Sequence, residues 1–309
     1  MARYIALRLA LAAVTIAGIS MIVFSLARLS GDVAATLIPP EAAQNPEQYE
    51  RIKHDLGLDK SYPEQYVIWV GDMVKGDFGR SITFRESTLS LYESKFPYTL
   101  RLAAVALLIA VGLGIPIGVT SALRPGSIWD RVATGFALLG QASPSFFVAI
   151  LMIFLFSVKL GWLPTSGPGG LKHYIMPAFS LSLFSIAALA RITRSAMLEV
   201  LDRDHIKLAR LNGVPERSIV WRHSFKNASI PILTYSSLQF VFFLSGSVVI
   251  ETIFAWPGIG QLSILAIRGR DYPLIQTIVL VTSTLVVFTT LAVDLLYAWI
   301  DPRIRYGSA

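Results

Sequence analysis

Long apolar runs alternate with short polar segments along this chain, and their lengths predict helices that cross a membrane. The first run, residues 9–27, contains no charged residue and is long enough to cross a hydrocarbon core of about 30 Å. We predict six spans in all, at residues 9–27, 102–123, 132–157, 174–190, 231–250 and 272–300. The pattern is therefore that of an all-α polytopic membrane protein with six transmembrane helices.

A cleaved signal peptide is the alternative for residues 9–27, because basic residues precede this run. The run is long for the apolar part of a signal peptide, and no small-residue cleavage site follows it cleanly. We interpret it as a retained helix whose N-terminus lies in the cytosol.

The composition supports a membrane protein. Of 309 residues, 54% are hydrophobic and 15% are charged, which is too apolar for an ordinary soluble domain. The net charge of +7 does not point to nucleic acid, because the basic residues lie mainly beside the apolar runs. The chain has no cysteine, so disulfides, thiol catalysis and thiolate metal sites are excluded.

The basic residues also predict the topology, because cytosolic connections are enriched in Lys and Arg. Basic residues outnumber acidic ones in residues 202–231, and the connection with Arg124 and Arg131 and the C-terminal segment with Arg303 and Arg305 are basic too. Six spans with both chain ends in the cytosol put all these segments on one side. Residues 30–98 then form a small region on the other side, where Tyr66–Val74 is expected to be an interfacial helix anchored by Trp69.

Residues 202–231 predict two short helices outside the bilayer. The first runs from Asp202 to Leu211 and ends at Asn212-Gly213, a pair suited to a left-handed C-cap. Pro215 then begins a second helix.

A polar patch interrupts the predicted third span at Gln141, Ser143 and Pro144. Polar groups and freed backbone groups at membrane depth need partners or water, so this patch is a candidate lining of a translocation pathway, with Ser237 of the fifth span. Helix packing is an equally good interpretation of these residues. Asp294 is the acidic residue nearest bilayer depth, and we favour an ion pair with an arginine over a transport role for it.

Several kinds of chemistry are missing from the sequence. There is no G-x-x-x-x-G-K-[ST] phosphate-binding loop, so energy from ATP would have to come from another polypeptide. The four histidines are scattered outside the apolar runs and predict no zinc site. Ser245-Gly246-Ser247 has no histidine or lysine within the spans to activate it, so we read it as helix packing rather than protease chemistry.

Motifs in order along nearly the whole chain resemble one family. Residues 202–231 resemble the coupling loop of ABC-importer permeases of the dipeptide, oligopeptide and nickel branch, through Ala209-Arg210, Gly213, Arg222-His223, Asn227 and Pro231. Lys207-Leu208 depart from the Glu-Ala that precedes the alanine in the general motif. Further matches are Leu56-Gly57-Leu58-Asp59, Gly76-Asp77-Phe78-Gly79, Glu251-x-x-Phe254-x-x-Pro257-Gly258-x-Gly260, Arg270-Asp271-Tyr272-Pro273 and Asp294-x-x-Tyr297-x-x-x-Asp301-Pro302-Arg303. The extended region after the first span is similar to that of the first, B-type, of the two permease chains.

The resemblance implies a fold and a function. The fold would be that of a type I ABC-importer permease, organised as residues 1–29, residues 30–98 and a core of residues 99–309 that includes the coupling loop 202–231. The chain would form half of a path for peptides or a related small solute and would not itself be an enzyme. The resemblance assigns ATPase coupling to Ala209, Arg210, Gly213, Pro215 and Glu216, and a periplasmic gate or docking role to Glu251 and Asp271.

The resemblance also implies partners and a location. These are a second homologous permease, two ATP-binding subunits that hold ATP and Mg, a periplasmic or lipid-anchored solute-binding protein, and membrane lipid, with no nucleic acid and no metal or cofactor in this chain. The location would be a bacterial inner membrane. A secondary carrier working alone is the alternative function, and the substrate (dipeptide, oligopeptide, nickel, glutathione or sugar) is left open.

Overall fold

A computed structural model of the protein describes residues 2–29, 46–55 and 57–300. In this part of the chain the regular structure is helical, apart from a single β-bridge between Arg80 and Ser87. The chain forms two compact units, Met1–Pro97 with Gln261–Ala309, and Tyr98–Gly260. The predicted motif residues Asp301, Pro302 and Arg303 lie outside the described residues, and the three-part division of the sequence stays a prediction.

The first unit contains α1 (Ala2–Leu29), α4 (Pro46–Asp55), α5 (Tyr62–Val74) and α15 (Tyr272–Ile300). The second contains α7 (Ile128–Ala142), α8 (Ser145–Met152), the π-helix η1 (Ile153–Lys159), α9 (Leu171–Leu201), α10 (Asp204–Leu211), α11 (Glu216–Ser218), the π-helix η2 (Ile219–Ser224), α12 (Phe225–Gly246) and α13 (Val248–Ile253). Two helices have residues in both units, α6 (Thr88–Leu123) and α14 (Ile259–Arg268).

Five stretches of helix are long and apolar enough to cross a membrane. They are residues 5–29, 88–123, 171–201, 216–245 and 272–295. A sixth candidate is the bent pair formed by residues 128–142 and 145–159. The predicted all-α polytopic class is confirmed, with the third span built differently from the prediction.

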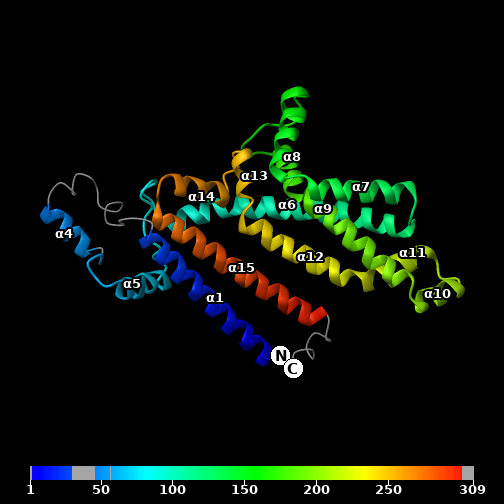
Figure 1. The fold of residues 1–309 in the computed structure, drawn as a ribbon, viewed down its shortest axis with the longest axis horizontal. Coiled ribbons are helices and arrows are strands. Elements are labelled where there is room, and N and C mark those ends of the chain that lie inside the picture. The colour runs from blue at the N-terminus through cyan, green and yellow to red at the C-terminus, as the bar shows by residue number, and fades with distance from the viewer. Residues whose placement is uncertain (1, 30–45, 56, 301–309) are drawn as a thin grey trace. The chain divides into compact units, whose positions relative to one another are not determined.

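In the first unit, α1 and α15 lie side by side and run in opposite directions (Figure 1). Arg8 of α1 forms an ion pair of 2.8 Å with Asp294 of α15, so the predicted arginine partner of Asp294 is present. The short helix α5 packs on α1 through Phe24, whose ring lies 5.4 Å from both Tyr66 and Trp69, measured between ring centroids. The predicted short helix therefore exists, and its Trp69 contacts another helix.

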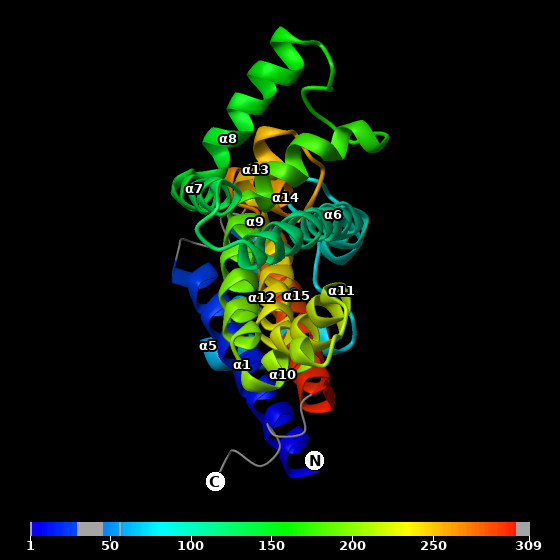
Figure 2. The ribbon, with the colours of Figure 1, turned by 90° about the vertical axis from the view of Figure 1, so that its right-hand side faces the viewer.

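The third span is broken rather than kinked, which corrects the prediction. The axes of residues 128–142 and 145–159 differ in direction by 103°, and α8 rises away from α7 in Figure 2. Proline disfavours the α conformation in the residue before it. Ser143 accordingly has φ −86° and ψ 121°, and its N–H donates the last bond of α7, to the carbonyl of Leu139 at 3.0 Å. The break therefore follows from Pro144, but its angle could not be read from the sequence.

Two other helices are longer than predicted. The predicted fourth span ends at residue 190, whereas α9 continues to Leu201. The predicted second short helix of residues 202–231 is instead the start of a continuous run, since α11, η2 and α12 follow one another without a gap up to Gly246. Pro231 lies inside α12 rather than at its start. Burial of Ile219 and Val220 explains this continuity, because it holds the start of the run against its neighbours.

We predict that cysteine labelling will report the six-span topology. The protein has no cysteine, so Lys60→Cys and Arg217→Cys each introduce a single thiol, and both positions are exposed. A membrane-impermeant maleimide should label the Lys60→Cys variant in intact cells and the Arg217→Cys variant only after permeabilisation. Labelling of the Arg217→Cys variant in intact cells would contradict the topology.

Candidate functional site

The segment from α10 to α11 forms a tight corner at one end of the second unit (Figure 1). Gly213 adopts φ +75°, the left-handed region that costs a residue with a Cβ atom about 1 kcal/mol or more. The corner is closed by two backbone hydrogen bonds, from Gly213 to Arg210 at 3.0 Å and from Val214 to Ala209 at 3.1 Å. The predicted left-handed cap at Gly213 is therefore present.

An ion pair spans this corner. Arg210 donates from Nη2 to Glu216 at 2.8 Å and from Nε to the same carboxylate at 3.3 Å. Hydrogen bonding to Glu216 raises the pKa of Arg210 above its ordinary value. This exposed pair joins the two sides of the corner at Gly213.

The inner face of α10 is anchored by Ile206. This side chain is fully buried in an apolar cluster that draws residues from α6, α9, η2 and α12. The cluster contains Val119, Ala122, Met197, Val200, Ile206, Ile219, Val220 and Ala228. Burying one isoleucine side chain contributes roughly 1.5–3 kcal/mol to stability. The helix α10 is therefore held by packing against all these helices and not only by its connection to α9.

The outer face of the same corner carries exposed apolar side chains. Leu208 is 58% exposed, Leu211 is 84% exposed, and Trp221 of η2 is half exposed. The predicted coupling residues Arg210, Gly213, Pro215 and Glu216 are exposed too, and Ala209 is half-buried. The predicted coupling residues include neither Leu208 nor Leu211, although these two follow a helical spacing of three.

A buried ion pair braces α7 against α9. Arg194 donates to both oxygens of Asp130, at 2.7 and 2.9 Å, while Asp130 is only 5% exposed. The carboxylate also accepts hydrogen bonds from the Ser121 hydroxyl and, at 2.8 Å, from the N–H of Gly126. This bidentate pair was missed in the sequence, because the partners lie 64 residues apart and each looks like an ordinary charge at a membrane edge.

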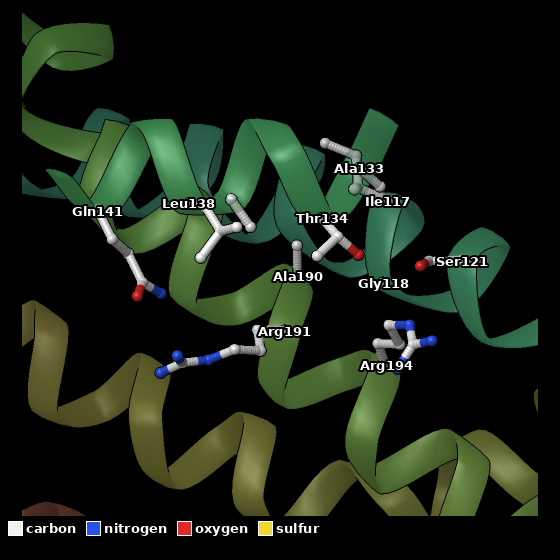
Figure 3. Close-up of a pocket in the computed structure, with 11 residues that line it drawn as sticks. Ile117, Gly118, Ser121, Ala133, Thr134, Leu138, Gln141, Ala190, Arg191 and Arg194 are labelled. Carbon is white, nitrogen blue, oxygen red and sulfur yellow. The ribbon is translucent and has the colours of Figure 1, made fainter. Parts of the chain in front are cut away.

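A cavity of about 230 Å³ lies between α6, α7 and α9, as Figure 3 shows. Its walls are mainly apolar, and its polar lining includes Gln141, Arg191 and Arg194. Gln141, one of the predicted pathway residues, therefore lines a cavity. Ser143 and Ser237 do not line it, and their hydroxyls donate to carbonyls of their own helices, Leu139 at 2.7 Å and Leu233 at 2.9 Å.

Glu251 is completely buried in the second unit. It accepts hydrogen bonds from the hydroxyls of Thr99 at 2.8 Å and Ser247 at 3.1 Å, while Thr99 in turn accepts from the N–H of Ile259. A Cβ atom at Gly258 would lie 2.5 Å from this carboxylate, which explains why glycine occupies the turn. The E-x-x-F-x-x-P-G-x-G motif thus builds a loop around a buried acid.

Asp271 is the corresponding anchor of the first unit. Its buried carboxylate accepts from the Ser81 hydroxyl at 2.5 Å, from the N–H of Thr83 at 3.0 Å and from the N–H of Leu274 at 3.2 Å. The last bond caps the start of α15. Asp271 therefore fastens the segment before α6 to the start of the last helix, and neither Asp271 nor Glu251 presents its carboxylate on the surface.

The comparisons with known proteins identify the class as membrane components of binding-protein-dependent transport systems. Residues 114–306 match the family model described as "Binding-protein-dependent transport system inner membrane component", and residues 1–103 match the model of its N-terminal part. The chain belongs to this family. It is a permease subunit of an ABC importer and not a stand-alone carrier.

Three relatives illustrate the match. The "Di/tripeptide transport system permease protein DppB" of Pseudomonas aeruginosa is 37% identical, with 99% of each chain covered. The "Oligopeptide transport system permease protein AppB" of Bacillus subtilis is also 37% identical, over 99% of this chain and 100% of its own length. The "Glutathione transport system permease protein GsiC" of Escherichia coli is 38% identical, over 93% of this chain and 94% of its own length.

A solved structure supports the fold. A chain of the solved structure titled "Inward facing conformations of the MetNI methionine ABC transporter: CY5 native crystal form" matches this protein with a TM-score of 0.59 and 19% sequence identity. The match covers 69% of this chain and 97% of that chain. At this identity the match speaks for the fold alone, which is that of a type I importer permease.

We predict that the buried pair of Asp130 and Arg194 stabilises the second unit. Breaking a buried ion pair costs roughly 3–5 kcal/mol, and we expect about 2 kcal/mol or more here, because the Arg194 side chain is one third exposed. Thermal unfolding of the purified protein in detergent should show a lower midpoint temperature for Arg194→Gln than for wild type. The double variant Asp130→Asn/Arg194→Gln should lose less stability than the sum of the losses in the two single variants.

The matched control is Arg203→Gln, which removes an exposed pair with Glu199 at 2.7 Å. Exposed pairs contribute about 0–1 kcal/mol, so this variant should unfold near the wild-type temperature. Equal effects of Arg194→Gln and Arg203→Gln would contradict the bracing role.

Proposed function

We propose that this protein is the B-type permease of a peptide importer in a bacterial inner membrane. It pairs with a second, homologous permease, and the two chains line one path. Two ATP-binding subunits hold ATP and Mg and dock on the cytosolic side, while a periplasmic or lipid-anchored binding protein delivers the solute. The names of relatives that match over nearly the full length support peptides or a related small solute as the cargo.

The observation that carries the proposal is the surface of α10 and α11. Its outer face exposes Leu208 and Leu211, and its inner face is buried through Ile206. An exposed apolar face on a firmly attached helix suits contact with a partner protein. We assign this contact to the ATP-binding subunit, with Ala209, Arg210, Gly213, Pro215 and Glu216 as the residues that shape it.

The same attachments explain how force enters the membrane. Packed interiors are hard to compress, so a displacement of α10 moves the helices that share the cluster around Ile206. Among these, α9 carries Arg194, which is bonded to Asp130 of α7. Closure of the two ATP-binding subunits would therefore shift α7, α9 and α12 together and change the path between the two permeases.

We assign the path itself to the region around the break in the third span. Gln141 lines the cavity there, and Ser143, Pro144 and Ser237 are proposed to contribute where the second permease completes the path. Glu251 and Asp271 are proposed to hold the loops of the periplasmic gate in shape, since both carboxylates are buried acceptors that fix loop backbone.

Reconstitution tests the assignment. The permease pair, the ATP-binding subunits and the binding protein should together import a di- or tripeptide into proteoliposomes only when ATP and Mg are present on the side of the ATP-binding subunits. Uptake that persists without the ATP-binding subunits would contradict the proposal.

We predict that the permease alone neither hydrolyses ATP nor binds it saturably, since its sequence has no phosphate-binding loop. The measurement is phosphate release by the purified chain in detergent. If the permease alone hydrolysed ATP at a rate comparable with that of the full complex, the assignment of hydrolysis to the ATP-binding subunits would be wrong.

We also predict that Gly213→Val uncouples hydrolysis from uptake. No atom lies within 4 Å of a Cβ at Gly213, so the substitution creates no clash and acts through backbone strain at the corner. Protein insertion should be unchanged, while uptake per ATP hydrolysed, or docking of the ATP-binding subunit, should fall several-fold.

Gly161→Val is the matched control, because Gly161 has φ +64° and equally open surroundings but lies in the connection between η1 and α9. It should keep wild-type coupling. Wild-type uptake and substrate-stimulated hydrolysis in Gly213→Val would rule out a coupling role for the corner.

A further inference from the structure

Arg191 is a positive charge well inside a helix that is apolar enough to span a membrane. The helix continues for ten residues beyond it, to Leu201, which is about 15 Å along the axis. The predicted span stopped just before Arg191, whereas the helix continues past it. A charged residue within a membrane span is costly and is therefore a functional-site hypothesis by default.

The neighbouring arginine shows what a structural role looks like. Arg194, one turn further along α9, is bonded to both oxygens of Asp130. Arg191 forms no such ion pair: among the residues that the structure describes, no carboxylate bonds to its guanidinium, and its charge interacts with the phenol of Tyr235. Its charge is therefore not used in an ion pair within the described chain.

The direction of the side chain is equally informative. In Figure 3 the Arg191 side chain extends toward the end of the cavity where Gln141 lies and away from Arg194 and Ser121. The guanidinium and the Gln141 amide thus approach the same space from α9 and α7.

The amide of Gln141 also lacks a hydrogen-bond partner within the described chain. The cavity therefore presents a charged fork and a neutral donor or acceptor against walls that include Ile117, Ala133 and Leu138. A guanidinium offers parallel N–H donors whose spacing matches the two oxygens of a carboxylate.

We infer that Arg191, with Gln141 beside it, forms a subsite for a carboxylate of the transported solute. This inference rests on the proposed function, because it takes the cavity to be part of the translocation path. A cavity of about 230 Å³ has room for a carboxylate and the group next to it but not for a long peptide. The subsite holds the carboxylate end during passage while the remainder of the solute lies in the path between the two permeases.

The second permease offers a competing partner, because an acidic residue on that chain would also satisfy Arg191. The cavity favours the solute, since a permanent ion pair would not need the open space beside Gln141. The two partners differ in one measurable respect. A solute subsite discriminates between solutes with and without a carboxylate, whereas a subunit contact affects all solutes equally.

The test compares uptake of tri-alanine and tri-alanine amide by the reconstituted importer, with the binding protein saturated by each peptide. Loss of a charge-assisted hydrogen bond lowers an affinity by about tenfold or more. We therefore expect Arg191→Gln to lower the acid-to-amide ratio of uptake by about tenfold relative to wild type, chiefly by slowing the acid. Arg191→Lys, which keeps the charge without the fork, should give an intermediate ratio.

Arg124→Gln serves as the control, because it removes a positive charge from the α6–α7 connection without touching this cavity. Its ratio should equal that of wild type. An unchanged ratio in Arg191→Gln, or an equal loss for both peptides, would overturn the carboxylate subsite and, in the second case, favour a contact with the second permease. Absence of ATP-dependent uptake of either peptide by wild type would instead contradict the proposed function.

Discussion

Burial of Ile206 is the interaction on which the position of α10 depends. The helix α10 has only eight residues, too few to be stable alone in water, so it persists because its inner face packs on other helices. Ile206 supplies that packing through Met197, Val200, Ile219 and Val220. Because Ile206 is buried in the core, α10 is held in place, and Leu208 and Leu211 on its outer face remain exposed for contact with a partner.

Buried acidic side chains organise other parts of each unit. Asp130 and Arg194 join α7 to α9, and the carboxylates of Glu251 and Asp271 each organise a loop within its own unit. All these acids accept several hydrogen bonds, which offsets the cost of burying a polar group. Arg191 differs because no bond of this kind occupies it within the described chain. The hydrogen-bonded acids therefore have a structural role, whereas Arg191 belongs to the proposed solute path.

Local features of this fold could be predicted from the sequence. The apolar runs located the long helices because crossing a membrane demands about twenty apolar residues, whatever the neighbours are. Gly213 was recognisable because a left-handed corner after a helix selects glycine. The arginine partner of Asp294 could also be expected, since an isolated acid at that depth needs one, although its identity as Arg8 required the structure.

Features that depend on distant contacts could not be predicted. Pro144 indicated that the third span is interrupted, but the 103° bend between its two halves depends on how α8 packs. The continuity from Glu216 into α12 depends on burial of Ile219 and Val220, which nothing in their local sequence reveals. The predicted fourth span ended before Arg191 because a charge normally ends an apolar run, and only the structure shows that α9 continues to Leu201. The pair of Asp130 and Arg194 had no local signal at all.

Attachment of α10 through Ile206 and of α7 through the Asp130–Arg194 pair predicts that the α10 surface and the start of α7 move as one body during the transport cycle. Electron paramagnetic resonance can measure the distance between spin labels at Leu208→Cys and Ile128→Cys, two exposed positions in the same unit of a protein without native cysteines. In the reconstituted importer we expect this distance to differ by less than about 2 Å between the nucleotide-free and ATP-bound states. A change of about 5 Å, the rise of one helical turn, would show that α10 moves independently of the helices beneath it and would contradict the account.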